Sequence, residues 1–233
     1  MNVLAVVPAY QAERTVAAVV SGLFSELPQT VGPRVAVIDD GSTDGTAREA
    51  ERAGAVVFRH PRNLGKGAAL RTGFGFALDA GFGAVVSVDA DGQHPPEEAA
   101  RIAGADAPRE ALVLGVRNLE RDGAPKLNRF SNAFSNVFLS WFGGVGIHDS
   151  QCGLRRYPVP ETLELGARSD GYAFEAEMLL RAARLGWRIV EIPVRVVYPP
   201  AAERVSHFHA VRDPARIVGR VLETTLRVRR QRS

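Results

Sequence analysis

The sequence predicts an α/β fold, in which a doubly wound and mostly parallel sheet carries helices on both faces, with a C-terminal amphipathic-helix elaboration. Short apolar runs of strand length alternate with segments whose apolar residues recur at helical spacing. Polar clusters follow three of these runs, and active sites of such sheets lie beyond the carboxyl ends of the strands. The chain has 233 residues, 45% of them hydrophobic, which suffices for one large domain.

The first half of the chain supplies five expected strands and two expected helices. Continuous apolar runs are typical of parallel strands that are buried on both faces. They occupy residues 3–7, 35–38, 55–58, 84–88 and 111–114. Helical spacing predicts helices over residues 15–27 and 68–80. Pro95-Pro96-Glu97 predicts a further helix start, since proline is tolerated in a first turn.

Residues 127–142 predict a long amphipathic helix in the second half of the chain. Its expected apolar face consists of Leu127, Phe130, Phe134, Val137, Phe138 and Trp141. Its opposite face carries Arg129, Asn132, Ser135, Asn136 and Ser140. Residues 189–197 return to strand character. Residues 212–233 carry seven arginines against Asp213 and Glu223, and they predict a basic helix that meets lipid headgroups or nucleic acid, or a solvated helix end.

Two carboxylates follow the fourth apolar run, in the segment Asp89-Ala90-Asp91. Residues i and i+2 of a strand point to the same side, so both side chains can converge on one cation. Mg²⁺ and Mn²⁺ prefer oxygen ligands, and Mg²⁺ usually takes one or two carboxylates together with substrate phosphates. A helix-loop-helix calcium site fits poorly, because His94 takes its glycine position and Ala100 takes its glutamate position. A solvated turn stays open as the alternative.

Two more motifs flank the expected strands and helices. Asp39 and Asp40 end the second run, where a carboxylate can accept hydrogen bonds from a ribose hydroxyl or a base N–H. Residues 42–44 suit the capping of the next helix. The loop Asn63-Leu64-Gly65-Lys66-Gly67 lacks the spacing of a P-loop, but a lysine between glycines can neutralise a diphosphate.

Four motifs occur in one order along the chain: Val6-Val7-Pro8-Ala9-Tyr10, Asp39-Asp40-Gly41-Ser42-Thr43-Asp44-Gly45-Thr46, Asn63-Leu64-Gly65-Lys66-Gly67 and Asp89-Ala90-Asp91. With them the sequence resembles the family 2 glycosyltransferases, which have the GT-A nucleotide-sugar fold. It looks closest to the branch that transfers sugars to dolichyl and polyprenyl phosphates. The resemblance runs from about residue 3 to about residue 213. It implies one domain over residues 1–233, with a nucleotide-sugar-binding half at 1–115, an acceptor half at 116–211 and the basic helix at 212–233.

The resemblance also implies a site, residue by residue. The donor would be a GDP- or UDP-linked sugar, bound by Pro8, Ala9, Tyr10, Ile38, Asp39, Asp40, Lys66, Asp89, Ala90, Asp91 and Arg117. The metal, Mg²⁺ or Mn²⁺, would be bound by Asp89, Asp91 and Gln93. The acceptor would be bound by Arg117, Arg129, Asp149, Gln151, Arg204 and His207. The catalytic candidates are Asp91, Arg117, Arg129, Glu175 and Glu177.

The family transfers its sugar with inversion, and the sequence leaves the acceptor open. A lipid phosphate is already anionic, whereas a hydroxyl acceptor needs a base, for which Glu175 or Glu177 is the candidate. The chain departs from the family pattern at Gln11-Ala12, where the family has Asn-Glu. It departs again at Arg204-Val205-Ser206-His207, where the mannosyl branch has a lysine after the serine. The second departure leaves the donor sugar open.

The amphipathic helix and the basic tail favour a protein that is peripheral to a membrane. No apolar run is long enough to span a bilayer, the N-terminus lacks a signal peptide, and the single Cys152 suits a reducing compartment. We therefore expect a cytoplasmic enzyme on the inner face of the membrane. The helix could instead pack on the sheet or in a homodimer.

A sugar-phosphate nucleotidyltransferase is disfavoured because no glycine-rich loop follows the first strand. A nucleic-acid binder is disfavoured because no aromatic residues interleave the basic tail, so no nucleic-acid partner is expected.

Overall fold

The computed structural model describes residues 2–27, 34–171, 173–198 and 219, and its centre is one seven-stranded sheet. The strands are β1 (Val3–Ala9), β2 (Val35–Asp39), β3 (Val56–Arg59), β4 (Ala84–Ser87), β5 (Leu112–Arg117), β6 (Arg155–Pro158) and β7 (Ile189–Val194). Their order across the sheet is β3-β2-β1-β4-β6-β5-β7. Only β6 runs against its neighbours β4 and β5, while the other pairings are parallel. The sheet is therefore mostly parallel, as the sequence predicts.

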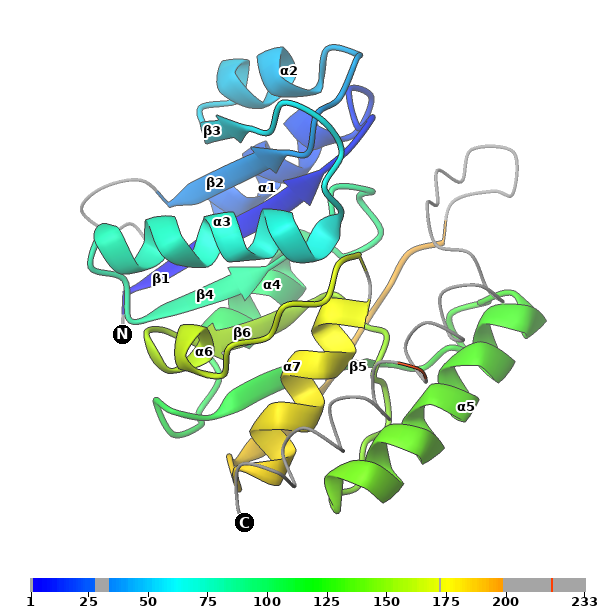
Figure 1. Cartoon of the computed structure of the whole chain (residues 1–233). Helices are drawn as coiled ribbons and strands as arrows, with labels where there is room; N and C mark the ends of the chain where they lie inside the picture. Colours follow the sequence, from blue (N-terminus) through cyan, green and yellow to red (C-terminus); the bar gives the residue numbers. More distant parts are fainter. Residues whose placement is uncertain (1, 28–33, 172, 199–218, 220–233) are drawn as a thin grey trace.

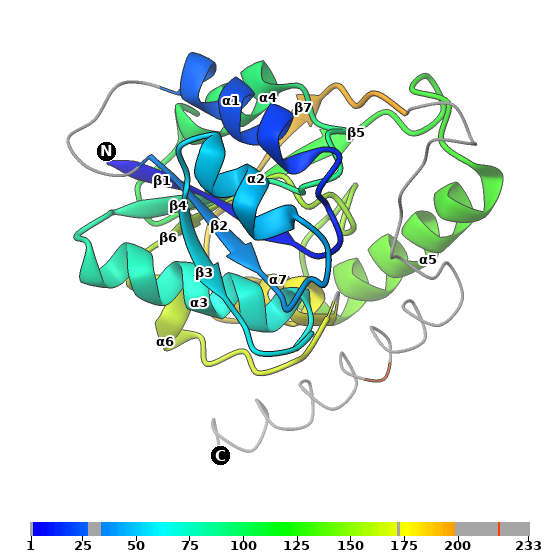
Figure 2. The same cartoon turned by 90° about the horizontal axis from the view of Figure 1, so that it is seen from above.

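Helices cover both faces of this sheet (Figures 1 and 2). They are α1 (Val16–Glu26), α2 (Thr46–Arg52), α3 (Lys66–Asp79), α4 (Pro96–Ala103), α5 (Lys126–Gly143), α6 (Glu161–Glu164) and α7 (Ala173–Arg184). One layer holds α1, α2 and α4, and the opposite layer holds α3, α6 and α7. Each layer closes its own apolar core cluster against the sheet. The helix start expected at Pro96 is confirmed.

The helix α5 stands at one side of the sheet, where it packs beside α7 (Figures 1 and 2). Its bounds agree with the prediction to within one residue at each end. Its orientation is unusual, because Ser131, Asn132 and Ser135 are buried while much of the apolar face is open to solvent. Of that face, Phe138 packs against the core. The exposed members are Leu127, Phe130, Phe134, Val137 and Trp141.

Three elements were not assigned from the sequence, namely β6, α6 and α7. β6 reads Arg155-Arg156-Tyr157-Pro158, and both arginines are buried in the sheet. The basic C-terminal helix expected over residues 212–233 lies outside the described residues, apart from Gly219. Within the described ranges, no helix is long and apolar enough to cross a membrane.

Candidate active site

A cleft of about 1000 Å³ lies at the carboxyl ends of the central strands. Its walls come from segments that are far apart in the sequence: residues 8–15 at the end of β1 and beyond it, Asp40 after β2, residues 63–66 at the start of α3, and residues 89–91 and 93–94 after β4. The second half of the chain adds Arg117, the loop residues Ser150 and Gln151, and Glu175 near the start of α7. The parallel register of β1, β2 and β4 brings these ends to one edge, as expected for a doubly wound sheet.

Three charged side chains meet on the floor of this cleft. The ammonium Nζ of Lys66 lies 2.6 Å from Oδ1 of Asp89 and 3.1 Å from Oε2 of Glu175. The other oxygen of Glu175, Oε1, is buried and has no hydrogen-bond partner. Lys66 is the first residue of α3 and follows Gly65, whose φ of 90° lies in the left-handed region. Gly65 also approaches the backbone of Gly171, so the loop that carries Lys66 packs against the segment that leads into α7.

Asp91 faces the same charge cluster. Burial disfavours a charge on Asp89, but the ammonium of Lys66 outweighs it and lowers the pKa of that carboxyl. Burial and the charge of Asp89 together raise the pKa of Asp91 to about 6. The charges of Lys66 and Arg117 act in the opposite direction but do not offset this rise, and Oδ1 of Asp91 accepts a hydrogen bond from the backbone N–H of Gln93, at 3.0 Å.

The oxygen chemistry of this set fits a hard divalent cation. Asp89, Asp91 and Gln93 all line the cleft, and each offers side-chain oxygen. Among the described residues, no group of three or more His, Cys, Asp or Glu side chains could hold a metal by itself. A metal at this place would therefore need further oxygen ligands from a bound substrate, which is the usual situation for Mg²⁺ beside phosphates.

The neighbouring residues Asp39 and Asp40 have different positions and partners. Asp40 lines the cleft, and its carboxylate accepts hydrogen bonds from the backbone N–H groups of Leu64, at 2.9 Å, and Gly65, at 2.7 Å. The ring of His60 contacts the same carboxylate at 2.7 Å. Asp40 therefore ties the end of β2 to the loop that carries Lys66.

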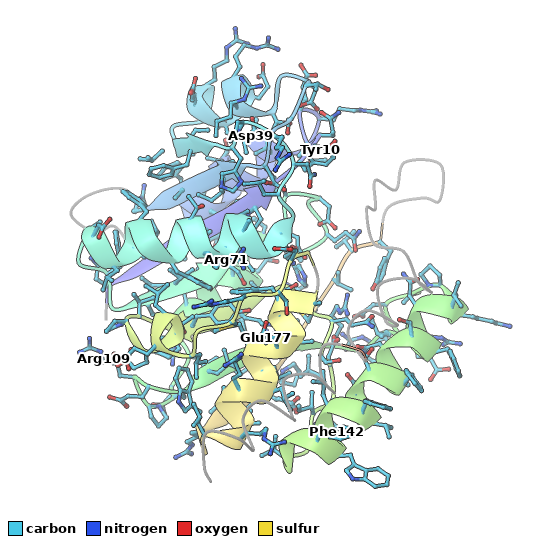
Figure 3. The ribbon with its side chains drawn as sticks, viewed as in Figure 1. Tyr10, Asp39, Arg71, Arg109, Phe142 and Glu177 are labelled. Carbon is cyan, nitrogen blue, oxygen red and sulfur yellow. The ribbon has the colours of Figure 1, made fainter. Side chains whose placement is uncertain are left out.

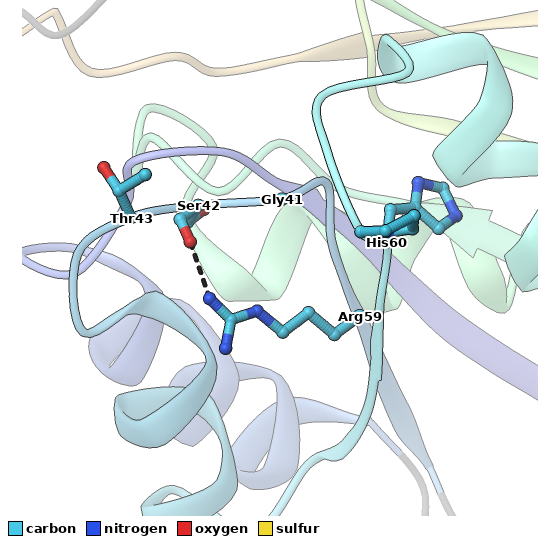
Figure 4. A pocket seen from close by; sticks show the side chains of 6 residues that line it. Gly41, Ser42, Thr43, Arg59 and His60 are labelled. Carbon is cyan, nitrogen blue, oxygen red and sulfur yellow. Dashed lines mark hydrogen bonds between the residues drawn. The ribbon is translucent and has the colours of Figure 1, made fainter.

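Asp39 is fully buried and does not line the cleft. It accepts a hydrogen bond from the N–H of Ser42 at 2.9 Å, and Nε of Arg59 lies 3.2 Å from its other oxygen. Arg59 also donates to the carbonyl of Ser42 beside a smaller open pocket of about 620 Å³ (Figure 4). Asp39 and Tyr10 lie at the same end of the sheet (Figure 3), because Ala9 pairs with Asp39 in the ladder. Tyr10 lines the cleft, whereas Asp39 supports its wall.

Arg117 and Asp149 form a buried bidentate ion pair at the opposite wall. Nε and Nη2 of Arg117 lie 2.7 Å and 3.0 Å from the two oxygens of Asp149, whose side chain is almost fully buried. Burial opposes the charge on Arg117, but the carboxylate of Asp149 still raises its pKa, so the guanidinium stays charged. Gln151 lies two residues further on and donates its amide to the hydroxyls of Ser131, at 3.0 Å, and Ser135, at 3.1 Å. The loop that carries this pair is thereby fixed to the polar face of α5.

Arg155 was not anticipated as a site residue, yet it holds two walls of the cleft together. Its guanidinium is fully buried and donates to the carbonyls of Ser150, Cys152 and Glu175, at 2.6, 2.8 and 3.0 Å. It joins the loop after α5 to the first turn of α7.

His94 was also not anticipated as a site residue. Burial lowers its pKa to about 4, so a neutral imidazole lines the cleft next to Gln93.

Five of the expected site residues do not line the cleft, namely Ile38, Asp39, Arg129, Asp149 and Glu177. Ile38 is fully buried in the core, and Arg129 lies on α5 with Nη1 3.4 Å from Glu120. Both carboxylate oxygens of Glu177 accept hydrogen bonds, one from Arg181 and the other from the backbone N–H groups of Arg168 and Ser169. The residue lies inside α7 (Figure 3). Its geometry favours a structural role, and its catalytic role stays a prediction. Arg204 and His207 lie outside the described residues.

Gly153 offers a local test of this geometry, because it passes directly over the charge cluster. A Cβ built on Gly153 would lie 2.7 Å from Nζ of Lys66 and in collision with Oδ2 of Asp89. We expect Gly153→Ala to displace that carboxylate and to lower catalytic activity by at least about tenfold, which corresponds to about 1.4 kcal/mol. The control is Gly146→Ala, whose added Cβ meets no atom within 4 Å. Equal activity of the two variants would contradict the assignment of Asp89 to the active site.

The comparison with protein-family models decides the family. Residues 4–161 match the model described as glycosyl transferase family 2. The chain belongs to glycosyltransferase family 2. The polyprenol monophosphomannose synthase of Mycolicibacterium smegmatis is 31% identical over 82% of this chain and 76% of its own length. The undecaprenyl-phosphate mannosyltransferase of Micrococcus luteus is 33% identical over 84% of each chain.

Solved structures show the same fold at lower identity. Mannosyl-3-phosphoglycerate synthase from Rubrobacter xylanophilus matches with a TM-score of 0.70 at 22% identity, over all of this chain and 75% of that one. Glucosyl-3-phosphoglycerate synthase from Mycobacterium tuberculosis, in complex with Mn²⁺, UDP and its product, matches with a TM-score of 0.66 at 20% identity, over 96% and 79%. The GT-A fold is thus confirmed, and this family 2 member is a glycosyltransferase.

Proposed function

We propose that this glycosyltransferase moves a sugar from a nucleoside diphosphate to a polyprenyl phosphate in a metal-dependent, inverting reaction. The observation that carries the proposal is the cleft floor, where Asp89, Asp91 and Glu175 face a single ammonium, that of Lys66. Three carboxylates against one ammonium leave an excess of negative charge, which repels a diphosphate unless a divalent cation accompanies it. The names of the two mannosyltransferase relatives favour a polyprenyl phosphate as the acceptor.

The donor is assigned to the edge formed by β1, β2 and β4. Tyr10, Pro8 and Ala9 line the cleft where a base and ribose would bind, with Asp40 at the end of β2. Lys66 provides the positive charge next to the diphosphate. Asp89, Asp91 and Gln93 would hold Mg²⁺ or Mn²⁺, which supplies Lewis-acid stabilisation of the leaving diphosphate.

The acceptor is assigned to the wall formed by Arg117 and the loop at 149–151. Arg117 gives Nε and Nη2 to Asp149, and Nη1 makes no hydrogen bond to the described residues, so it can donate to a phosphate oxygen. The acceptor oxygen forms a bond to the anomeric carbon of the sugar. The bond from that carbon to the diphosphate breaks on the opposite side, and the configuration inverts. A lipid phosphate is anionic near neutral pH, so no base is required for this step.

Transfer to a hydroxyl is a second candidate, favoured by one observation. Glu175 has a buried oxygen, Oε1, without a hydrogen-bond partner, and the residue lines the cleft. Such a carboxylate can accept the proton of an attacking hydroxyl.

The first test of either reaction is a donor panel. Purified protein is incubated with Mn²⁺, a polyprenyl phosphate and each of several GDP- and UDP-sugars, and we expect a glycosylated lipid phosphate from at least one donor. Donor consumption without any lipid product would contradict the proposal.

We further assign the exposed apolar face of α5 to the surface of a membrane, from which a polyprenyl phosphate must be taken. Trp141 is 82% exposed and Phe130 is 71% exposed, which is costly for aromatic side chains in water. The polar face of the same helix is occupied by hydrogen bonds to the loop at 147–151, including the bond from the N–H of Ser150 to Asn136 at 2.8 Å. This docking would bring the lipid phosphate towards Arg117.

The two tryptophans of the chain, Trp141 and Trp187, allow a direct measurement. Trp187 packs against the core, so a Trp187→Phe protein reports on α5 alone. We expect its fluorescence to shift to the blue on vesicles that contain anionic lipid. In this background Phe130→Ser should weaken vesicle binding by about tenfold, given about 1.5–3 kcal/mol for a buried aromatic side chain. The control is Leu185→Ser, an exposed leucine outside α5. Unchanged fluorescence together with a dimer in solution would show that a second copy covers α5 instead.

A further inference from the structure

Lysine is rare in this chain, and one of the few lysines lies in the candidate active site. The sequence has 29 lysine and arginine residues, but only Lys66 and Lys126 are lysines. Lys126 is exposed at the start of α5, whereas the side chain of Lys66 is 11% exposed and lies between two carboxylates. Lysine carries a compact charge on a flexible stem with rotatable donors, while arginine favours fixed planar pairing. Lysine is therefore better suited than arginine to a position where the cation changes partners.

The two partners of Lys66 have different surroundings. Glu175 is 5% exposed, its Oε1 has no hydrogen bond, and its Oε2 lies 3.1 Å from the ammonium. Asp89 is closer to solvent and stands next to Asp91, a second carboxylate that lines the cleft. The ammonium therefore neutralises one member of the carboxylate pair to which the metal is assigned.

A divalent cation and the ammonium compete for the same carboxylate. Oδ1 of Asp89 is 2.6 Å from Nζ of Lys66, which leaves no room for an ion on that side of the oxygen. Two cations close to one carboxylate also repel each other strongly in a partly buried site. Binding of a metal without a diphosphate should thus be weak. A bound diphosphate would offer the ammonium new oxygens and remove the competition.

We propose that Lys66 is an internal counter-ion that holds Asp89 and Glu175 in the donor-free protein and transfers from Asp89 to the donor diphosphate on loading. This inference rests on the metal and donor assignments of the proposed function. It makes Lys66 a positioning residue that couples the two ligands: each strengthens the binding of the other by the same factor.

The coupling predicts opposite effects of one substitution. In Lys66→Met the competing ammonium is gone, so Mn²⁺ alone should bind more tightly than to the unmodified protein, by at least about tenfold for one removed charge contact. A nucleoside diphosphate should bind more weakly to the same variant, and the mutual strengthening of Mn²⁺ and nucleotide should shrink. General damage to the fold would weaken both ligands together, so the opposite signs identify a counter-ion.

The experiment measures free Mn²⁺ by electron paramagnetic resonance with UDP, with GDP and without nucleotide. It compares the unmodified protein with Lys66→Met and with Lys126→Met, which should behave as unmodified. Tighter binding of Mn²⁺ alone to Lys66→Met supports the inference. Equal binding of Mn²⁺ alone to the unmodified protein and to Lys66→Met overturns the inference and leaves the metal assignment intact. No binding to any of the three proteins, with or without nucleotide, removes the metal assignment itself.

A second measurement needs no variant, so it stays informative if Lys66→Met does not fold. Acetylation of the two lysines is followed by mass spectrometry, with Lys126 as the internal reference. Lys66 should react slowly in the metal-free protein, faster with saturating Mn²⁺ alone, and slowly again with Mn²⁺ and UDP or GDP. If the rate at Lys66 does not change while Mn²⁺ is bound, the inference is wrong.

Discussion

Replacing Asp91 by asparagine is expected to lower the rate of sugar transfer by about three orders of magnitude, or about 4 kcal/mol of transition-state stabilisation. The amide keeps the size of the carboxylate and can still accept the hydrogen bond from the N–H of Gln93. It cannot supply the negative charge that the proposed metal requires. The loss should therefore arise from weaker metal binding, measured as the Mn²⁺ concentration at half-maximal activity, and not from a changed fold.

Stability provides a second signature of the same variant. Burial and Asp89 raise the pKa of Asp91 to about 6, so this carboxyl keeps its proton in the folded protein at pH values where it has lost it in the unfolded chain. Asp91 should therefore contribute a loss of stability as the pH rises to about 6 in the metal-free protein, and Asp91→Asn should remove this contribution, while the lowered pKa of His94 contributes a gain with pH in both proteins. Urea denaturation at pH 4.5 and pH 7.5 measures the difference, with the exposed Asp106→Asn as control. Full activity of Asp91→Asn at low Mn²⁺ would contradict the metal role.

Replacing Arg117 by methionine is expected to abolish transfer and to lower the free energy of unfolding by about 3–5 kcal/mol. The reason for the second effect is that Asp149 is almost fully buried and would keep its charge without its bidentate partner. The double variant Arg117→Met/Asp149→Asn removes both charges and should recover much of the stability. It should remain inactive if the guanidinium contacts the acceptor phosphate.

Urea denaturation and transfer assays on the single and double variants separate these two roles. Recovery of stability without recovery of activity supports contact between Arg117 and a substrate. Recovery of both in the double variant would mean that Arg117 serves only to neutralise Asp149, and the acceptor assignment would then fall to other groups.

The first half of the fold could be predicted because its signals are local. Buried parallel strands are continuously apolar, so β1, β2 and β4 are recognisable, and the carboxylates that follow them occupy one edge of the sheet. The family motifs also fall on the cleft, with Tyr10, Asp40, Lys66 and Asp91 lining it. The bounds of α5 follow from its helical period.

The rest depends on contacts between distant segments. β6 contains two arginines that no strand pattern favours, and it is stable because Arg155 and Arg156 donate to backbone carbonyls. The pattern of α5 gives two faces but does not say which is buried, and here the polar face packs inward through serine and asparagine hydrogen bonds. The meeting of Lys66 with Glu175 depends on the packing of α3 against α7 and leaves no trace in either motif.

The central claim concerns the acceptor, and a matched pair of lipids tests it most directly. The protein, Mn²⁺ and the active donor sugar are incubated with a polyprenyl phosphate or with the corresponding polyprenol, and the lipid products are identified by mass spectrometry. We predict a glycosyl-phosphoryl lipid from the phosphate and no product from the alcohol. A product from the alcohol, with none from the phosphate, would contradict the account and move the catalytic role to Glu175 as a base.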